Sequence, residues 1–398
     1  GWQVFPGATG PLRWNPLQIG RRINPERQMR ATCELVRNAG QMGPRQMGYM
    51  RRTLKELYLE HGVLTSFREV LADDRWNTVR EEEWDAVDAA RAEWELGPRR
   101  REGGVHLADL ESFERQAVAV QRSKAVDMTM WCDRLNQLLD GMRVGSPDHT
   151  SLEGVLLRLE PFTEGEMEQM YGRGEGSIAI EELGMLGPAE DAWGISVLEG
   201  GAEMDEFAKA VVFSLAGWHL YNDAVVRRRL HLGRATLPTL QVFFEEANKV
   251  LSGVAVDVGD QDSGSGSTSE IWQTMWRDGR KYGIWLHLIA QTVSDLPAGI
   301  LSSCNNAFYS QTKDARDRDQ IMAHLAFSEK GFTDEDYKRF ISRMPAAMSV
   351  CKLGYSMDII HTTPFLCRPV MVPGQEPTDA ELLQHHVAMR AARRGAVE

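Results

Sequence analysis

Two adjacent carboxylates, Glu245 and Glu246, follow the apolar stretch 239–244 (TLQVFF), which is typical of a buried strand. Adjacent acids at the end of a buried strand cost desolvation free energy unless a cation compensates their charge. The pattern fits a site for a nucleoside triphosphate, where one acid holds Mg²⁺ and the second orients and activates the attacking water. The alternative is structural, because both acids would also be favourable at the N-terminus of the predicted helix that follows.

A polar side chain, Gln291, ends the next predicted strand, 284–291 (IWLHLIAQ). In a parallel sheet, ligands bind outside the carboxyl ends of the strands, so Gln291 and the two acids are predicted to lie at the same edge. A side-chain amide both donates and accepts hydrogen bonds, and it can therefore hold a γ-phosphate or the attacking water. The alternative is an amide whose hydrogen bonds are satisfied by its own loop.

Two basic residues, Arg277 and Arg280, lie in the segment 277–283 (RDGRKYG), at the end of the helix predicted before the Gln291 strand. The helix macrodipole alone favours cationic side chains in the last turn of a helix. The functional alternative is that Arg277 or Arg280 is an arginine finger, which reaches into the site of a neighbouring subunit.

Other catalytic machinery is absent from the sequence, which lacks GxSxG, HExxH and CxxC motifs. The net charge of −12 argues against a protein that nucleic acid coats over its whole surface, but not against a small basic channel. The five cysteines are scattered, which predicts free thiols in a reducing cytoplasm. No apolar run reaches the roughly 20 residues that a membrane-spanning helix needs, and no signal peptide is predicted.

The chain around these residues divides into regions of different pattern. Residues 24–150 carry apolar side chains at helical spacing, which predicts an all-α insertion. Within it, the spacing predicts one long helix over 107–142. Ser66 with Glu69 has the pattern of a capping box, and Thr78 is a candidate N-cap.

Strands alternate with helices over 151–373, which predicts an α/β core with a largely parallel sheet covered on both faces. Residues 1–23 add a first strand and a Pro/Gly-rich connection, and 374–398 are predicted to form a polar helical tail. A second capping box, Ser267 with Glu270, opens the helix that carries the two arginines. The later predicted strands span residues 193–200, 239–244, 284–291, 307–312, 347–353 and 365–372.

The chain resembles the C-terminal half of the HerA/FtsK superfamily of ring ATPases, and in particular the ATPases of type IV secretion and conjugation. The resemblance lies in 240–251 (LQVFFEEANKVL) and 275–308 (MWRDGRKYGIWLHLIAQTVSDLPAGILSSCNNAF). These segments have a Walker B-like strand, a helix ending in a basic turn and a strand ending in Gln. Upstream, 11–17 (PLRWNPL) and 159–176 (LEPFTEGEMEQMYGRGEG) are similar to the same group.

This resemblance implies a RecA-like P-loop NTPase core with an inserted all-α domain, and ATP and Mg²⁺ as cofactors. It implies that Glu246 is the catalytic carboxylate and that Glu245 coordinates Mg²⁺, directly or through water and only with nucleotide. The family usually has Asp at the position of Glu245, which is a departure. It further implies that Gln291 senses the γ-phosphate and that Arg277 or Arg280 is the finger.

A phosphate-binding loop is the main departure from that family. The sequence contains no GxxxxGK[ST], and no Lys follows a Gly. Without this loop, no nest of backbone N–H groups cradles the phosphates. In the family the loop precedes the segment that begins here as WQVFPG (2–7), so the chain is expected to be the part that follows the loop. The alternatives are that another chain supplies the loop or that this copy does not hydrolyse ATP.

The expected function is therefore part of an ATP-driven ring motor, inactive alone, that translocates DNA or protein in conjugation or type IV secretion. The alternatives are a HerA-type DNA-processing or defence motor and an inert scaffold subunit of a ring assembly. The resemblance implies a homo-oligomer, a hexameric ring, that acts with components of a secretion channel. It also implies a cytoplasmic location, with peripheral association with the inner membrane as an alternative.

Overall fold

The computed structural model describes residues 2–5, 13–99, 104–172, 195–198, 204–230, 240–247, 274–296, 298–301, 303–325, 333–353 and 364–368. The chain divides into two compact units. The first comprises Gly1–Leu240, Lys281–Ile284 and Leu383–Glu398, and the second comprises Gln241–Arg280 and Trp285–Leu382. Among the helices of the described residues, none has the length and hydrophobicity that crossing a membrane requires.

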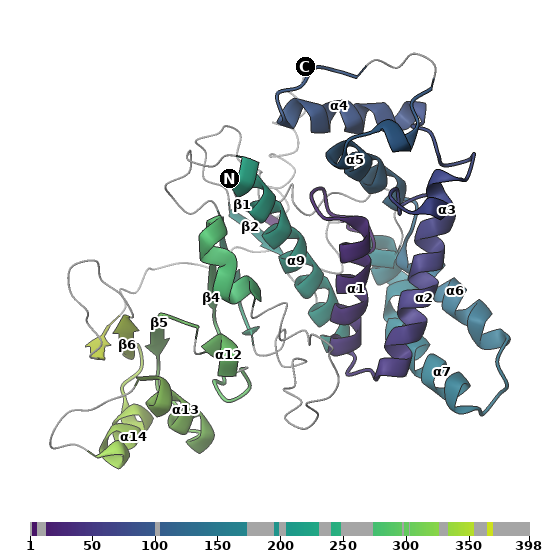
Figure 1. Ribbon diagram of the computed structural model, residues 1–398. Coiled ribbons are helices and arrows are strands. Elements are labelled where there is room, and N and C mark those ends of the chain that lie inside the picture. Colours follow the sequence, from purple (N-terminus) through teal and green to yellow (C-terminus); the bar gives the residue numbers. More distant parts are fainter. Residues whose placement is uncertain are drawn as a thin grey trace. The chain divides into compact units, whose positions relative to one another are not determined.

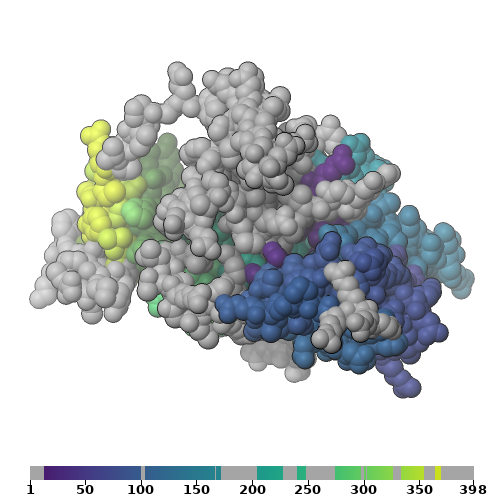
Figure 2. Space-filling model, turned by 90° about the horizontal axis from the view of Figure 1, so that it is seen from above, coloured from purple at the N-terminus to yellow at the C-terminus, as the bar shows by residue number. Residues whose placement is uncertain are grey.

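Helices dominate the first unit, where α1 lies between α2 and α9 (Figure 1). In the space-filling view of Figure 2, the residues coloured blue form one continuous mass. The elements of this unit are β1 (Trp2–Phe5), α1 (Pro25–Ala39), α2 (Pro44–Glu60), α3 (Arg68–Leu71), η1 (Glu81–Glu83), α4 (Trp84–Glu93), η2 (Leu107–Asp109), α5 (Ser112–Ser123), α6 (Met128–Asp140), α7 (Pro147–Leu159), η3 (Glu160–Thr163), α8 (Gly165–Met167), η4 (Glu168–Gly172), β2 (Ile195–Leu198) and α9 (Glu206–Leu230).

Local signals fix the ends of the first two helices. The side chain of Asn24 accepts two backbone N–H groups of the first turn of α1, at 3.0 and 3.2 Å. Pro25 occupies the first helical position, where its missing N–H costs nothing. Gly62 follows α2 with a φ of 65°, a left-handed conformation, and a Cβ there would lie 2.6 Å from Trp76. Gly62 therefore closes α2, as its position in the sequence predicts.

The single helix predicted over 107–142 is wrong, because the structure divides this segment. After η2, α5 ends at Ser123 and α6 begins at Met128. Asp127 caps α6 by accepting the backbone N–H of Met130 at 2.9 Å. A short acidic side chain that satisfies a helix start favours a break, which the spacing of apolar residues alone does not reveal.

The two predicted caps near the start of this unit are also wrong. α3 begins one residue too late for Ser66 to cap it, and it has no side-chain cap. Thr78 pairs with His106 in an isolated antiparallel bridge. This bridge keeps the backbone at Thr78 out of a helix, so the helical turn η1 starts after Arg80 instead.

A buried ion pair joins α5 to η1. Arg122 and Glu83 are 5% and 2% exposed, and hydrogen bonds of 2.7 and 3.1 Å connect the guanidinium to the carboxylate. Arg122 also donates to the backbone carbonyls of Gly62, Trp76 and Thr78, at 3.2, 2.9 and 2.9 Å. Every N–H group of the guanidinium thus has an acceptor, which is the condition under which a buried charge is tolerated.

A second buried carboxylate, Glu114, lies in the first turn of α5. It has no exposed surface, and it meets Arg91 and Arg99 at 2.5 and 2.7 Å. Desolvation offsets most of the attraction in such pairs, so they are a poor guide to high stability. They do penalise alternative packings, since a rearrangement leaves a buried charge without its partner. Short helices whose apolar faces alone would tolerate several arrangements are thereby held in one.

Within the described residues, the strands form two parallel pairs and one antiparallel sheet. β1 pairs in parallel with β2. The remaining strands and helices are β3 (Leu240–Phe244), η6 (Gly279–Tyr282), β4 (Ile284–Leu288), α12 (Ala298–Leu301), β5 (Asn306–Tyr309), α13 (Ala315–Leu325), α14 (Asp334–Arg343), β6 (Ser349–Leu353) and β7 (Phe365–Cys367). The chain is therefore a mixed α/β protein, as its sequence predicts.

β3 and β4 are neighbours and run in the same direction. The N–H of Leu240 donates to the carbonyl of Gly283 at 3.1 Å, and the N–H of Ala247 donates to the carbonyl of Ile289 at 3.0 Å. Hydrogen-bond partners thus advance together along both strands, which is the pattern of a parallel pair.

β5, β6 and β7 are antiparallel, whereas a largely parallel sheet is predicted for residues 151–373. Two helices, α13 and α14, lie between β5 and β6. One helix between two strands carries the chain back to the end where the first strand began, so the next strand runs parallel to it. Two successive helices leave the chain at the opposite end, so the next strand runs antiparallel. The predicted capping box Ser267 with Glu270 and the predicted tail 374–398 lie outside the described residues.

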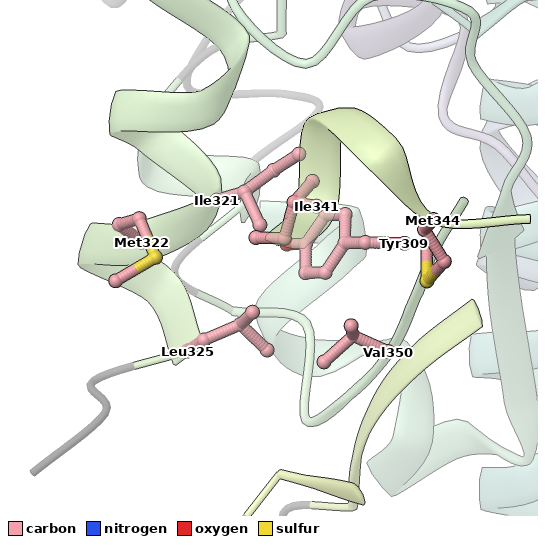
Figure 3. Close-up of a cluster of buried hydrophobic side chains, with 7 residues drawn as sticks. All are labelled: Tyr309, Ile321, Met322, Leu325, Ile341, Met344 and Val350. Atoms are coloured by element: carbon pink, nitrogen blue, oxygen red, sulfur yellow. The ribbon is translucent and has the colours of Figure 1, made fainter. Parts of the chain in front are cut away.

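The antiparallel sheet packs against α13 and α14 through one hydrophobic cluster (Figure 3). Its buried members are Tyr309, Ile321, Met322, Leu325, Ile341, Met344 and Val350. Tyr309 and Val350 are directly opposite each other on neighbouring strands. Ile321, Leu325 and Ile341 have no exposed surface. This packing fixes α13 on one face of the sheet.

His324 adds a polar contact between α13 and the sheet. The hydroxyl of Tyr309 lies 2.6 Å from Nδ1 of His324, and Nε2 lies 3.2 Å from the carbonyl oxygen of Cys304. This arrangement assigns the ring proton to Nε2, since a carbonyl only accepts. Burial, and the nearby charge of Lys352, lower the pKa of His324. The folded unit therefore favours the neutral imidazole.

Replacing Arg122 by methionine should lower the free energy of unfolding by about 3–5 kcal/mol, because Glu83 is left buried without a counter-charge. Urea unfolding measures the change. If Arg122→Met does not fold, Glu83→Gln serves as the second variant and should also be destabilised. The control is Arg134→Met, which removes a more exposed ion pair with Glu60 (2.5 Å) and should cost at most about 1 kcal/mol. Equal losses for the Arg122 and Arg134 variants would contradict the role of the buried pair.

Acid should destabilise the second unit through His324. The pKa of His324 is lower in the folded chain, so the unfolded chain binds more protons once the pH falls below about 6.5. The stability that the neutral ring contributes is complete above that pH and is lost as the pH falls towards the folded pKa. Unfolding of wild type and His324→Gln between about pH 7.5 and pH 5 measures it. A stability difference between the two proteins that does not shrink on acidification would refute this assignment.

Candidate functional site

The carboxyl ends of β3 and β4 are joined by two backbone hydrogen bonds of one residue. The N–H of Ile289 donates to the carbonyl of Phe244 at 2.9 Å, and the carbonyl of Ile289 accepts the N–H of Ala247 at 3.0 Å. Glu245 and Glu246 lie between these two anchored positions. Since Phe244 and Ala247 are both buried, the acid pair forms a short turn whose two ends are held against β4.

The two acids have different environments. Glu245 is exposed, whereas Glu246 is half-buried. Glu246 has a φ of 50°, in the left-handed region that residues other than glycine rarely adopt. Such a conformation costs about 1–2 kcal/mol, so the surrounding hydrogen bonds hold it in place. Strained residues of this kind concentrate at functional sites, which makes Glu246 the more notable of the two acids.

Gln291 lies at the same edge, two residues after Ile289. β4 ends at Leu288, so Gln291 belongs to the connection after the strand rather than to the strand itself as predicted. Its side chain is exposed. The strand pairing therefore places Gln291 two residues beyond Ile289, whose backbone is bonded to both sides of the acid turn.

The connection after Gln291 has an ordered backbone of its own. The hydroxyl of Thr292 donates to Asp295 at 2.7 Å. The backbone N–H groups of Val293 and Ser294 both donate to Oδ1 of Asp317 in α13, at 3.0 and 2.7 Å. Asp317 is only 2% exposed. Sequence reasoning misses this contact, since an acid in the first turn of a helix is ordinarily explained by the macrodipole.

The two arginines lie on the helical turn that precedes β4. Residues 274–278 are helical, and Trp276 from this helix packs near Phe244, with ring centroids 6.1 Å apart. The side chain of Arg277 is 70% exposed and lies 3.5 Å from Asp278. Arg280, in η6, is also exposed. Both arginine side chains are therefore largely exposed to solvent.

One face of the β3–β4 pair is exposed, which the sequence did not predict. Phe243 and Trp285 are 61% and 45% exposed, and Ile289 is 52% exposed. Phe243 stacks on His287 of the neighbouring strand, with ring centroids 4.2 Å apart and an interplanar angle of 9°. Burial lowers the pKa of His287. These exposed residues occupy alternate positions, which is the period of a strand with one side facing solvent. The residues between them are mostly apolar as well, so the sequence does not reveal this period.

Metal ligands are sparse around the acid turn. Within the described part of the chain, no group of three or more His, Cys, Asp or Glu side chains could hold a metal ion. Two neighbouring carboxylates and an amide nevertheless supply oxygen donors, which Mg²⁺ prefers, and Mg²⁺ usually completes its shell with water and phosphate oxygens. This donor set suits a metal that arrives with a nucleotide.

Comparison of the chain with protein-family models and with curated proteins finds no match.

The strain at Glu246 predicts an inverted preference for glycine. At an ordinary position glycine is less stable than alanine by about 0.5–1 kcal/mol, but a φ of 50° should reverse that order. We expect Glu246→Gly to be more stable than Glu246→Ala by about 0.5–1 kcal/mol in urea unfolding. At Glu245, the matched control, Ala should be more stable than Gly. Alanine above glycine at both positions would show that the backbone at Glu246 is not strained.

Proposed function

We propose that the chain is part of a ring ATPase of the HerA/FtsK superfamily and that it carries the catalytic carboxylate of that motor. The observation that carries this proposal is the pair of hydrogen bonds of Ile289, which holds the acid turn and Gln291 at one end of two parallel strands. Ligands of α/β proteins bind at this end of the strands. Two acids and an amide are the side chains that nucleotide hydrolysis uses there.

Glu246 is the general base in this proposal. Its constrained backbone and half-buried side chain support the role, because a base must be held where it can take a proton from the attacking water. Gln291 orients that water or contacts the γ-phosphate. Glu245, which is exposed, would hold Mg²⁺ directly or through water. Bound Mg·ATP would supply the transferable phosphoryl group, and its Mg²⁺ ion would compensate the charge of the acids.

Arg277 and Arg280 are proposed to act on a neighbouring subunit. Their exposure supports this role, since an arginine finger must leave its own subunit to reach the site of the next. A finger in trans requires a homo-oligomer, and we infer a hexameric ring. The motor would be cytoplasmic, in solution or at the inner membrane, and would move DNA or protein with other components of a secretion or conjugation machine.

The absence of a GxxxxGK[ST] motif favours a second candidate function. These residues contain no loop that would cradle the phosphates, so either residues beyond them or another subunit must supply it. If neither does, the chain is an inert subunit that packs into a ring and binds partners. Nucleotide binding separates the two candidates, because an inert subunit has no use for Mg·ATP.

ATP turnover of the full-length gene product tests the proposal. Glu246→Gln should lower kcat by about 10²–10⁴-fold while ATP binding persists, because the amide cannot accept the proton of the attacking water. Glu335→Gln, an exposed substitution on α14, is the matched control and should behave like wild type. An active wild type that Glu246→Gln leaves unchanged would remove Glu246 from the mechanism. A full-length protein that neither binds nor hydrolyses ATP would support the inert subunit.

A further inference from the structure

The connection that carries Gln291 is held by one buried carboxylate. Two successive backbone N–H groups, of Val293 and Ser294, converge on Oδ1 of Asp317, at 3.0 and 2.7 Å. Successive N–H groups that point at one anionic oxygen form a small anion nest, and hydrogen bonds to a charged acceptor are the stronger kind. Gln291 lies only two residues before the first of these anchored positions.

Asp317 is not needed to start its own helix. Asp314 accepts the backbone N–H groups of Arg316 and Asp317, at 2.8 and 3.2 Å, and so caps α13. The carboxylate of Asp317 is therefore available for the connection after β4. It is 2% exposed, and an acid buried to this degree would be unfavourable if it met no donors.

The helix that carries Asp317 is itself fixed. Ile321 and Leu325 of α13 belong to the buried cluster that packs on β5 and β6 (Figure 3). Val293, in the connection after β4, packs against the same cluster. The apolar cluster thus sets the distance between α13 and the connection, and Asp317 fixes the direction of its backbone.

We propose that Asp317 is a positioning residue, which orients the connection after β4 so that Gln291 faces the acid turn. The inference rests on the proposed function of Gln291 and Glu246, and it adds a residue that touches neither nucleotide nor water. In this role Asp317 restricts the backbone torsion angles of the connection. Two hydrogen bonds at adjacent residues limit rotation of the backbone from Thr292 onwards, and the Thr292 to Asp295 contact closes the same turn.

Two substitutions separate this role from general destabilisation. Asp317→Ala leaves two backbone N–H groups without their acceptor. Asp317→Asn retains an oxygen that can accept both, although without the charge. Asp319→Ala is the matched control, because Asp319 lies on the same helix and is exposed, and its partner is Lys338 of α14 at 2.8 Å.

The experiment combines hydrogen exchange with ATP turnover on the full-length protein. In Asp317→Ala, amides in 292–296 should exchange faster while those in 337–341 of α14 stay protected. The kcat should fall by up to about a hundredfold with little change in KM, since small displacements of a catalytic group have effects of this size. Asp317→Asn should recover most of the protection and activity, and Asp319→Ala should match wild type.

Two results would overturn the inference. One is unchanged exchange of 292–296 in Asp317→Ala, which would mean that Asp317 does not hold the connection. The other is faster exchange with wild-type kcat, which would mean that the held connection does not matter to Gln291. A wild type that hydrolyses no ATP refutes the proposed function instead, and then the exchange data alone decide whether Asp317 anchors this segment.

Discussion

Ile289 uses both of its backbone hydrogen-bonding groups to clamp the end of β3. Its N–H donates to the carbonyl of Phe244, and its carbonyl accepts the N–H of Ala247. The backbone of the two acids between them is therefore held next to β4. Backbone hydrogen bonds do this better than side-chain contacts, because they fix position without depending on rotamers. The exposed Glu245 and the strained Glu246 lie between these two hydrogen bonds, and Gln291 lies two residues after Ile289. A one-residue slip of β4 would move every one of them to a different place.

Sequence patterns predict some features of this fold well and miss others for definite physical reasons. Strong local signals, such as Pro25 after Asn24 and Gly62 after α2, predict helix ends because they act within a few residues. Apolar spacing continues across Asp127, and it therefore does not reveal the break there. Two helices rather than one separate β5 from β6, so the simple alternation that predicts a parallel sheet does not hold there.

The candidate site shows the same division. Glu245, Glu246 and Gln291 are recognisable because strand ends of a parallel sheet share an edge, which is a rule of topology. The positive φ of Glu246 has no local sequence signal, and the hydrogen bonds of Phe244 and Ala247 on either side of it go to a residue more than 40 positions away. Asp317 escapes notice for the same reason, because its partners lie 23 and 24 residues before it. The candidate catalytic residues stand in local sequence patterns, whereas Asp317 is identified only by contacts that the fold creates.

The acid turn and the connection after Gln291 are held by different contacts, so one can move relative to the other. Glu246 is fixed by the β3–β4 pairing, whereas the connection after Gln291 is fixed to α13 through Asp317 and Val293. α13 in turn rests on the apolar cluster with β5 and β6. A displacement of that helix relative to the parallel pair would change the distance between the amide and the acids while leaving each intact. In the proposed motor, such a displacement would link the state of the nucleotide to movement of the protein, and the hydrogen bonds of Asp317 would transmit it.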